Sequence, residues 1–431
     1  MAPDRRPDQP FDQSLVPPSL LALDLEALAD RFGTPLFVYD EDELRRRCRE
    51  YVSHFGAKNV AYASKAFLCS AMARLVAEEG LLIDVATGGE LHVALRAGFP
   101  PARVTFHGNN KSESELSTAI GAGVGRIVAD SSDELDRLER LAGERVVDVL
   151  VRVTPGVEAH THEFIETGTE RSKFGFTVTG GVAREAALRV AGSPRMRLAG
   201  LHCHIGSQIY RLDSYARSVE IVTRLAAEIA GESGEPIEEL NFGGGLGVRY
   251  LSEDPEVDVA AYAKTLHEAL AEAAEANGLA PLPRLGVEPG RSIAAAAAVT
   301  LYRVGTIKEI PGIGTYLAVD GGMSDNPRPV LYGAGYEAFL PTRVAAERPL
   351  ACAVVGKHCE QGDVLVADAH LPIGVRPGDL LATPTTGAYG YSMASNYNKV
   401  PRPAVVFVRE GEPRVVVRRE TDDDLLRLDE P

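Results

Sequence analysis

The sequence has few cysteines and no long apolar segment. Its five cysteines, Cys48, Cys69, Cys203, Cys352 and Cys359, are scattered over 431 residues and form no C-x-x-C pair. This number and spacing exclude a disulfide framework and do not indicate a zinc knuckle or a thioredoxin-type site. No stretch approaches the roughly 18 consecutive apolar residues that predict a membrane-spanning helix. The N-terminus also lacks the apolar region of a signal peptide, so we expect a cytoplasmic protein.

Positively charged residues are outnumbered as well: the sequence has 45 lysines and arginines and 61 aspartates and glutamates, which gives a formal net charge of -16. A negative excess of this size argues against nucleic acid or an anionic membrane as a partner. The hydrophobic fraction of 45% and the charged fraction of 25% are ordinary for a globular protein. Because the chain is long for a single core, we expect two domains.

Short apolar runs alternate with helical patterns from about residue 60 to residue 290. The runs lie at residues 60–63, 82–85, 104–107, 126–129, 147–153, 198–204, 237–242 and 285–288. Sequences typical of capping boxes at residues 112–115 and 131–134 mark the starts of two of the helices. Eight strand–helix units close a parallel barrel, so we predict an α/β fold with a (β/α)8 TIM barrel.

The two ends of the chain differ from this barrel. Before it we expect a disordered polar tail and one amphipathic helix over residues 20–32, ended by Gly33. After about residue 294, β-branched runs are separated by turns without long helical patterns, which predicts an antiparallel β domain, a barrel or a sandwich. The predicted domains are the barrel at residues 38–293 and the β domain at residues 1–37 and 294–431, with the N-terminal segment packed on the C-terminal strands.

Polar residues stand where the predicted barrel strands end. They are Lys65, Asp84, His107, Asp130, Arg152, His204, Gly243 and Glu288. In barrels of this type the carboxyl ends of the strands carry the active site. The pattern therefore predicts that these residues surround one active site.

Lys65 is the central candidate among them. It follows the apolar run at residues 59–63, and burial at a strand end would lower the pKa of its ammonium and make it a Schiff-base nucleophile. The alternative is a lysine whose stem packs on the strand end while its ammonium reaches solvent. The other strand-end residues favour the nucleophile.

A glycine-rich loop, Gly243-Gly244-Gly245-Leu246-Gly247, directly follows a predicted strand. Glycines let the backbone approach an anion closely, and successive N–H groups can bind a phosphate. The spacing fits neither the Rossmann fingerprint nor a P-loop. A tight turn is the alternative, but barrels often bind phosphate with the loops after their last two strands, which favours a phosphate site here.

Glu288 ends the last run, and a buried carboxylate needs a cationic or hydrogen-bonding partner. A protonated pyridine nitrogen would supply one, and so would an ion pair with Arg291. His202 and His204 lie two residues apart, hence on one side of a strand, where they can ligate a metal or stack on a flat cofactor ring. We favour the ring, because no further histidine completes a metal-ligand set convincingly.

Cys359 lies in a polar turn at residues 356–363, between two predicted strands. Most isolated cysteines are inert core residues. The charged and polar neighbours of this one suit an exposed thiol that can ionise.

Together these motifs resemble the alanine-racemase-fold pyridoxal phosphate decarboxylases. The resemblance covers about residues 20 to 410 and rests on the segments at residues 62–65, 204–208, 243–247, 288–291, 356–363 and 387–390. Within this group, the segments at residues 158–162, 173–175, 320–329 and 391–398 are similar to those of the diaminopimelate decarboxylases. Gln361, which stands where a serine is common, is the one small departure.

The resemblance implies a pyridoxal 5'-phosphate cofactor and the decarboxylation of meso-2,6-diaminopimelate to L-lysine and CO2, the last step of lysine biosynthesis. The implied cofactor contacts are Lys65, Asp84, His204, Ser207, Gly243, Gly244, Gly245, Glu288, Gly290, Arg291 and Tyr389. The implied substrate contacts are Arg291, Arg328, Tyr332, Glu360 and Tyr389. Lys65, His204 and Cys359 are the implied catalytic residues. Cys359 and Glu360 would come from the partner subunit of a homodimer with shared active sites, with Cys359 as the proton donor.

Other functions stay open from the sequence alone. A decarboxylase of the same fold could act on ornithine, arginine, a D-amino acid or carboxynorspermidine, but these lack a complete distal amino-acid group for Arg291 and Arg328 to bind. A metal-dependent barrel hydrolase would use His202 and His204. An inactive regulatory homologue would have no need of Lys65 and Cys359. A glutamate at position 288 favours decarboxylation over racemisation.

Overall fold

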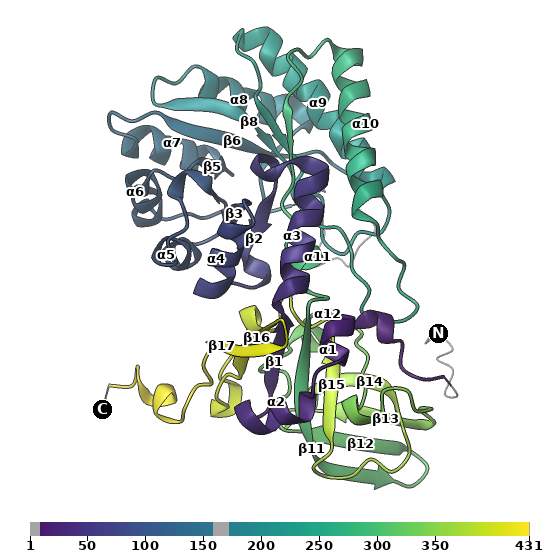
Figure 1. The fold of residues 1–431 in the computed structure, drawn as a ribbon. Helices are drawn as coiled ribbons and strands as arrows, with labels where there is room; N and C mark the ends of the chain where they lie inside the picture. Colours follow the sequence, from purple (N-terminus) through teal and green to yellow (C-terminus); the bar gives the residue numbers. More distant parts are fainter. Residues whose placement is uncertain (1–8, 158–171, 431) are drawn as a thin grey trace. The chain divides into compact units, whose positions relative to one another are not determined.

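The structure is a computed structural model that describes residues 9–157 and 172–430 (Figure 1). The chain forms two compact units, which we call the barrel unit and the β unit. The barrel unit contains Arg47–Gly247 and Val257–Gly290, and the β unit contains Met1–Arg46, Val248–Glu256 and Arg291–Pro431. Residues 248–256, which the sequence prediction assigns to the barrel, therefore group with the β unit.

Parallel strands form the barrel and follow one another in sequence order. They are β2 (Ala61–Ala63), β3 (Leu82–Val85), β4 (Val104–Phe106), β5 (Arg126–Ala129), β6 (Val147–Thr154), β8 (Met196–His202), β9 (Glu239–Asn241) and β10 (Arg284–Gly286), with a short β7 (Phe176–Thr177) beside β6. Val60 and Val287 form a parallel bridge, and the Ala61 N–H donates to the Val287 oxygen at 2.9 Å. The first and last strands therefore meet, which confirms the predicted barrel.

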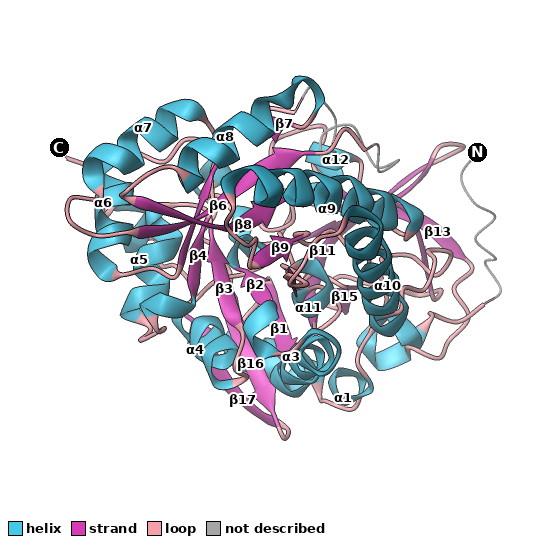
Figure 2. Ribbon diagram, turned by 90° about the horizontal axis from the view of Figure 1, so that it is seen from above, coloured by secondary structure: helices cyan, strands magenta, loops and turns pink. Residues whose placement is uncertain are grey.

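Helices lie outside these strands, as the view in Figure 2 shows. They are α4 (Ser70–Glu78), α5 (Gly88–Arg96), α6 (Glu113–Ala122), α7 (Ser132–Leu141), α8 (Val182–Ala191), α9 (Asp213–Ser233) and α10 (Val259–Asn277), and α3 (Glu41–Phe55) precedes the first barrel strand. The capping box predicted for α6 is confirmed, since Ser112 and Glu115 accept each other's backbone N–H. Of the helices in the described ranges, none is long and apolar enough to cross a membrane.

The capping box predicted for α7 is only half correct. The Ser131 hydroxyl accepts the Glu134 N–H at 3.3 Å, as a cap requires. The Glu134 carboxylate, however, accepts from Lys111 Nζ at 2.6 Å and from the Asp130 N–H at 3.0 Å. Because Lys111 is buried and a buried ammonium needs a counter-charge, the ion pair outweighs the second half of the cap.

The β unit is built on a sheet in the order β14-β13-β12-β11-β1-β16-β17, with β15 beside β11. Its strands are β1 (Leu36–Asp40), β11 (Ala298–Ile310), β12 (Gly314–Val319), β13 (Leu350–Val355), β14 (Val364–Leu371), β15 (Leu380–Pro384), β16 (Ala404–Arg409) and β17 (Glu412–Val417), and its short helices include α11 (Arg291–Ala294) and α12 (Arg328–Tyr332). The sheet is mostly antiparallel as predicted, but β1 with β16 and β12 with β13 are parallel pairs. Strand β1 comes from before the barrel, so no hairpin fixes its direction against β16.

The segment before β1 packs on this sheet. The single helix predicted over residues 20–32 is wrong: two helices, α1 (Pro18–Leu21) and α2 (Leu25–Phe32), form instead. Asp24 separates them, because its side chain caps α2 by accepting the N–H of Ala27 at 2.9 Å. Gly33 ends α2, as predicted.

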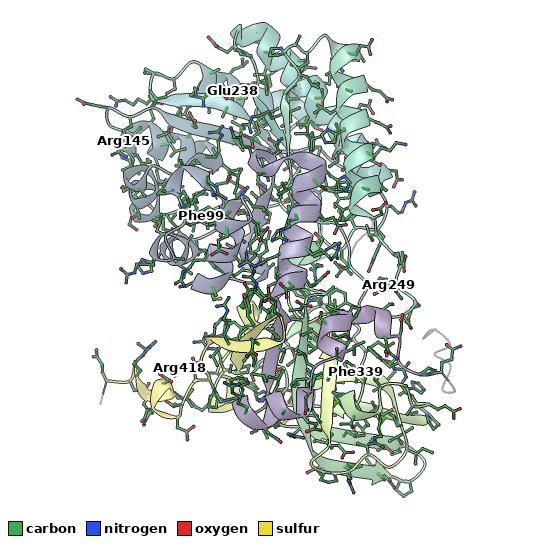
Figure 3. All side chains as sticks on the ribbon, viewed as in Figure 1. Phe99, Arg145, Glu238, Arg249, Phe339 and Arg418 are labelled. Atoms are coloured by element: carbon green, nitrogen blue, oxygen red, sulfur yellow. The ribbon has the colours of Figure 1, made fainter. Side chains whose placement is uncertain are left out.

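Part of the predicted disordered tail is also ordered. Residues 13–15 form a single turn of 3-10 helix, and Phe11 and Leu15 are buried. The Phe11 ring stacks on Phe339, which Figure 3 labels, with 4.4 Å between the ring centroids. Phe11 and Leu15 cover apolar residues of the sheet that would otherwise be exposed. This burial explains why the segment is ordered.

Candidate active site

Glu288 lies just after β10 and is buried among donors from other barrel strands. Its Oε1 lies 2.9 Å from His107 Nε2, just after β4, and its Oε2 lies 3.0 Å from His202 Nε2, at the end of β8. Asn241 Nδ2, at the end of β9, also donates to Oε1 at 3.0 Å. These three donors meet the predicted need of the carboxylate for partners without an ion pair to Arg291.

The Glu288 carboxylate suits a protonated ring nitrogen. A carboxylate offers about four acceptor positions, and the three donors leave one of them, on Oε2, for a further N–H. Burial raises the pKa of Glu288, but the charge of His107 and the hydrogen bonds from His107 and His202 outweigh burial and hold it well below its usual range. Glu288 is therefore an ionised acceptor, as a pyridinium N–H requires.

The two histidines differ in charge. Burial lowers the pKa of His107, yet the nearby carboxylates of Asp84 and Glu288 outweigh burial, and the net shift is upward. For His202 burial dominates and lowers the pKa to about 4. Asp84, whose Oδ1 lies 3.8 Å from His107 Nε2, has a pKa raised to about 6, mainly by burial. The pKa of His107 is thus raised by the two carboxylates beside it, whereas His202 is neutral around neutral pH.

Lys65 lies in a single turn of 3-10 helix, Ser64–Ala66, directly after β2. The predicted burial of its side chain is wrong: Lys65 is exposed, whereas Ser64 and Ala66 on either side of it are buried. The strand ends at Ala63, and the turn that follows directs residue 65 away from the packing that buries its neighbours. The lysine at this strand end is therefore accessible to a small molecule.

Gly290 brings the Glu288 segment against the Lys65 turn. A Cβ atom at Gly290 would lie 3.0 Å from Ala63 Cβ and 3.1 Å from Ala66 Cβ, so a larger residue would push the two segments apart. The Ala63 N–H also donates to the Pro289 oxygen at 3.1 Å. The ammonium and the carboxylate on which a pyridoxal site would depend thus come from directly adjacent segments.

His204 does not share a strand face with His202, because β8 ends at His202. His202 bonds to Glu288, whereas His204 lies against the glycine loop: a Cβ at Gly243 would be 2.8 Å from His204 Nδ1. Burial, followed by the positive charges of Lys65 and Arg152, holds the pKa of His204 well below its usual range. His204 therefore presents a neutral, flat ring.

The loop at Gly243–Gly245 needs glycine for close packing. Gly243 and Gly245 have φ of +66° and +104°, and a Cβ at Gly244 would lie 2.2 Å from the Glu288 oxygen. The Gly243 N–H is already used, because it donates to Asn241 Oδ1 at 2.9 Å. Within the described ranges, the N–H groups of Gly244 and Gly245 donate to no protein oxygen, so they are available to an anion.

Ser207, another predicted cofactor contact in this unit, lies in the loop after β8. It follows Gly206, whose carbonyl oxygen would be 2.2 Å from a Cβ at Gly245. Ser207 is half-buried there. The glycine loop and the Ser207 loop thus touch, as a shared phosphate site would require.

His107, His202 and Glu288 also form a group that could hold a metal ion, since their donor atoms lie within 4.8 Å of one another. This is not the His202–His204 pair that the sequence indicated as a possible ligand set. Both histidines already direct Nε2 at Glu288, so a metal would have to displace two hydrogen bonds. The same geometry suits the ring nitrogen without any such loss.

Arg328, on α12 of the β unit, is a buried cation surrounded by tyrosines. Its Cζ lies 4.3 Å from the centroid of the Tyr250 ring, and its Nη1 donates to the Tyr336 hydroxyl. Burial lowers the pKa of Arg328, but the oxygens of Tyr250, Tyr336 and Tyr389 more than offset this, and the net shift is upward. Its partners among the described residues are tyrosines and not carboxylates, which leaves a buried cation suited to an anionic ligand.

Arg291 joins the same group of tyrosines. Its Nη1 donates to the Tyr250 hydroxyl at 2.7 Å, and its Cζ lies 4.7 Å from the centroid of the Tyr389 ring. Tyr332, the last residue of α12, is half-buried. Arg291 follows Glu288 by three residues, so the peptide chain alone keeps their Cα atoms within about 11 Å.

Cys359 is exposed, as predicted, in the turn between β13 and β14. Its N–H donates to Asn398 Oδ1 at 3.1 Å, and the neighbouring Glu360, also exposed, accepts from the Tyr397 hydroxyl at 3.4 Å. Asp363 fixes the turn, because its carboxylate accepts the N–H of His358 at 2.8 Å and that of Met323 at 2.6 Å. The thiol is thus held on an ordered turn and open to solvent.

Several of these residues have no individual role in the prediction from the sequence: His107, Asn241, Tyr250, Tyr336 and Asp363. His107 ends a predicted strand, which was the one signal that could have found it. The tyrosines lie in loops and follow no periodic pattern. Residues 158–162, which carry part of the family resemblance, lie outside the described residues, whereas residues 173–175 are described.

Comparisons with known proteins agree with this geometry. The family model of the pyridoxal-dependent decarboxylases, pyridoxal binding domain, matches residues 41–295. The diaminopimelate decarboxylase of Mycobacterium tuberculosis (strain ATCC 25618 / H37Rv) is 52% identical over 421 residues, which cover 95% of this chain and 94% of that protein. The enzyme of that name from Bacillus subtilis (strain 168) is 47% identical over 410 residues, covering 94% of this chain and 93% of that protein.

A solved structure is similar over nearly the whole chain. The diaminopimelate decarboxylase of Helicobacter pylori, complexed with L-lysine, superposes with a TM-score of 0.86 at 31% sequence identity. The match covers 94% of this chain and 99% of that one. Both units of the fold therefore have a counterpart in it.

Proposed function

This chain belongs to the pyridoxal-dependent decarboxylases and, within them, to the diaminopimelate decarboxylases, and on that premise we propose how its residues act. The reaction converts meso-2,6-diaminopimelate to L-lysine and CO2, the last step of lysine biosynthesis. When bound, pyridoxal 5'-phosphate supplies a conjugated ring that accepts the electron pair left behind by the departing carboxylate. The chain's own residues bind the cofactor and the substrate, orient them, and supply the proton that replaces CO2.

In the barrel unit, Lys65, accessible at the end of β2, would hold the cofactor through its Nζ. Glu288 would accept the ring N–H at the open position on Oε2, and its negative charge would stabilise the positive charge of that ring. His204 would pack its neutral ring against the cofactor. The N–H groups of Gly244 and Gly245 would bind the phosphate, since neither donates to an acceptor among the described residues.

Arg328 sets the substrate specificity by binding the distal carboxylate, with Arg291 and Tyr332 beside it. The observation that carries this assignment is a buried guanidinium that has tyrosine neighbours and no carboxylate partner within the described ranges. Decarboxylases of ornithine or arginine act on substrates without a distal carboxylate, and such enzymes would gain nothing from this cation. Tyr389, whose ring lies beside Arg291, is assigned to both cofactor and substrate binding in this proposal.

Cys359 donates the proton that replaces CO2, and it does so in the site of a partner subunit. Its exposed position on an ordered turn supports a thiol that another chain can approach, and Glu360 would then contact the partner's substrate. We therefore propose a homodimer with shared active sites. An exposed thiol that must stay reduced also suits the cytoplasm as its location.

The test is product formation by the purified protein. With added pyridoxal 5'-phosphate and meso-2,6-diaminopimelate, L-lysine and CO2 should appear in equal amounts, as measured by mass spectrometry and CO2 trapping. After removal of the cofactor the rate should fall to background and return when the cofactor is restored. A holo-protein that binds the cofactor but leaves diaminopimelate unchanged would refute the proposal.

A further inference from the structure

Glu288 is held by neighbours that the proposed function leaves without a role. We propose that His107 and His202 are positioning residues for Glu288, an inference that rests on the proposed function. Each histidine places its Nε2 against a different carboxylate oxygen, at 2.9 and 3.0 Å, and Asn241 Nδ2 adds a bond to Oε1 at 3.0 Å. The carboxylate cannot rotate without breaking these bonds, so its open acceptor position has a fixed direction.

His107 also sets the charge around Glu288. Its imidazolium lies between two carboxylates, with Glu288 Oε1 at 2.9 Å and Asp84 Oδ1 at 3.8 Å. Two negative charges and one positive charge sum to -1, and a protonated ring nitrogen brings the sum to zero. His107 thus allows Glu288 to stay ionised while buried, and Asp84 restores the negative charge that the ring nitrogen needs.

His202 acts as the neutral donor. With its pKa lowered to about 4, its ring carries one proton near neutral pH, and the bond to Glu288 places that proton on Nε2. His202 Nδ1 has no hydrogen-bond partner among the described residues. With the proton on Nε2, Nδ1 carries only a lone pair, and leaving a buried lone pair without a partner costs less free energy than leaving an N–H without one. Other charged groups around this site are Lys65, Glu90 and Arg152, and Arg152 lies 3.8 Å from Asp130.

The test compares two compounds on the apo-protein: pyridoxal 5'-phosphate and its 1-deaza analogue, in which C–H replaces the ring nitrogen. Wild type should bind pyridoxal 5'-phosphate more tightly, because only the nitrogen can donate to Glu288. His107→Phe, which keeps a ring but no donor, should reduce this preference by about tenfold or more. His107→Gln, which keeps a donor near the position of Nε2, should retain part of it. His267→Gln, on the exposed face of α10, is the matched control and should equal wild type.

Histidine NMR of the wild-type apo-protein adds a readout that depends on no variant folding and on no activity. His107 should be doubly protonated at pH 7 and should lose its proton only above the usual histidine range. His202 should be neutral at the same pH, with its proton on Nε2. Asp84→Asn should lower the pH at which His107 titrates, because it removes one of the two flanking carboxylates.

The two proposals fail in different ways. An unchanged preference for pyridoxal 5'-phosphate in a folded His107→Phe protein would overturn the positioning role, and so would a neutral His107 at pH 7 in wild type. Failure of wild type to bind either compound would instead contradict the proposed function itself.

Discussion

At the scale of single residues, the neighbours of a side chain decide what it can do. Glu288 is an ionised acceptor because two histidines outweigh the effect of burial on its pKa. Lys65 is accessible because it lies in a turn after its strand and not within it. Arg328 is a candidate for carboxylate binding because its partners are tyrosines, which leave its charge uncompensated.

Lys65→Ala should abolish covalent attachment of the cofactor. Borohydride reduction of the wild-type holo-protein should fix the cofactor on the peptide that contains Lys65, as seen by mass spectrometry. Lys111 should stay unlabelled, because it is buried and bonded to Glu134 and to two carbonyl oxygens. Lys58→Ala removes an exposed lysine close in sequence and should behave as wild type; label on any other lysine would refute the assignment.

Arg328→Ala should cost about 2–5 kcal/mol of binding to diaminopimelate, because it removes the partner of a desolvated carboxylate. The loss should appear in kcat/KM, while the absorption spectrum of the bound cofactor stays that of wild type. Arg343→Ala is the control, since Arg343 lies in the same unit and pairs with Asp379 at the surface. If Arg328→Ala still prefers diaminopimelate over monocarboxylic amino acids, the distal carboxylate is bound elsewhere.

At the scale of elements, short turns hold the reactive groups in place. The turn with Cys359 is fixed by Asp363, whose carboxylate joins it to the loop before α12 through the Met323 N–H. A Cβ at Gly356 would lie 2.1 Å from Asp363 Oδ2, so the glycine makes room for the carboxylate. The Cys359 turn and the segment that leads to Arg328 are thus mechanically linked.

Asp363→Asn should loosen this turn, because an amide cannot accept both N–H groups at its two terminal atoms. Each lost bond is worth about 0.5–1.5 kcal/mol. Amide hydrogen exchange over residues 356–363 and alkylation of Cys359 by iodoacetamide should both accelerate, and kcat should fall. Asp368→Asn, at an exposed position of β14, should leave the hydrogen exchange, the alkylation rate and kcat unchanged. Unchanged exchange in Asp363→Asn would show that the turn is held by other contacts.

Much of the element scale could be predicted from the sequence, because it depends on local signals. The barrel strands were predicted close to their actual bounds, since apolar runs and helix caps recur along the chain. The partners of Glu288 could not be predicted from the sequence, because His107 is 181 residues away and only the closed barrel brings it near. The parallel pairing of β1 with β16 likewise depends on strands that no local turn connects.

At the scale of the whole molecule, the proposed shared active sites need two subunits. The barrel unit contains Lys65, His204 and Glu288, and the proton donor to the carbon that loses CO2 is assigned to Cys359 of another chain. A symmetric dimer would give each subunit the same role toward the other, so both sites would be completed in the same way.

Cys359→Ala and Lys65→Ala should each be nearly inactive alone and should complement each other when mixed. Random pairing at equal concentrations makes half of the dimers mixed, each with one intact site, so activity should recover to about a quarter of wild type. The measurement is lysine formation after subunit exchange, confirmed independently by native mass spectrometry. Exchange without recovery of activity would place both residues in the site of one chain.

The central claim is that this chain decarboxylates diaminopimelate, and competition between substrates tests it most directly. The holo-protein is given equal concentrations of meso-2,6-diaminopimelate, L-ornithine, L-arginine and L-lysine in D2O, and all of them are followed by mass spectrometry. We predict that diaminopimelate alone is consumed and that the new lysine carries a single deuterium at the carbon that lost CO2. Faster consumption of ornithine or arginine, or no loss of diaminopimelate by protein with bound cofactor, would contradict the account.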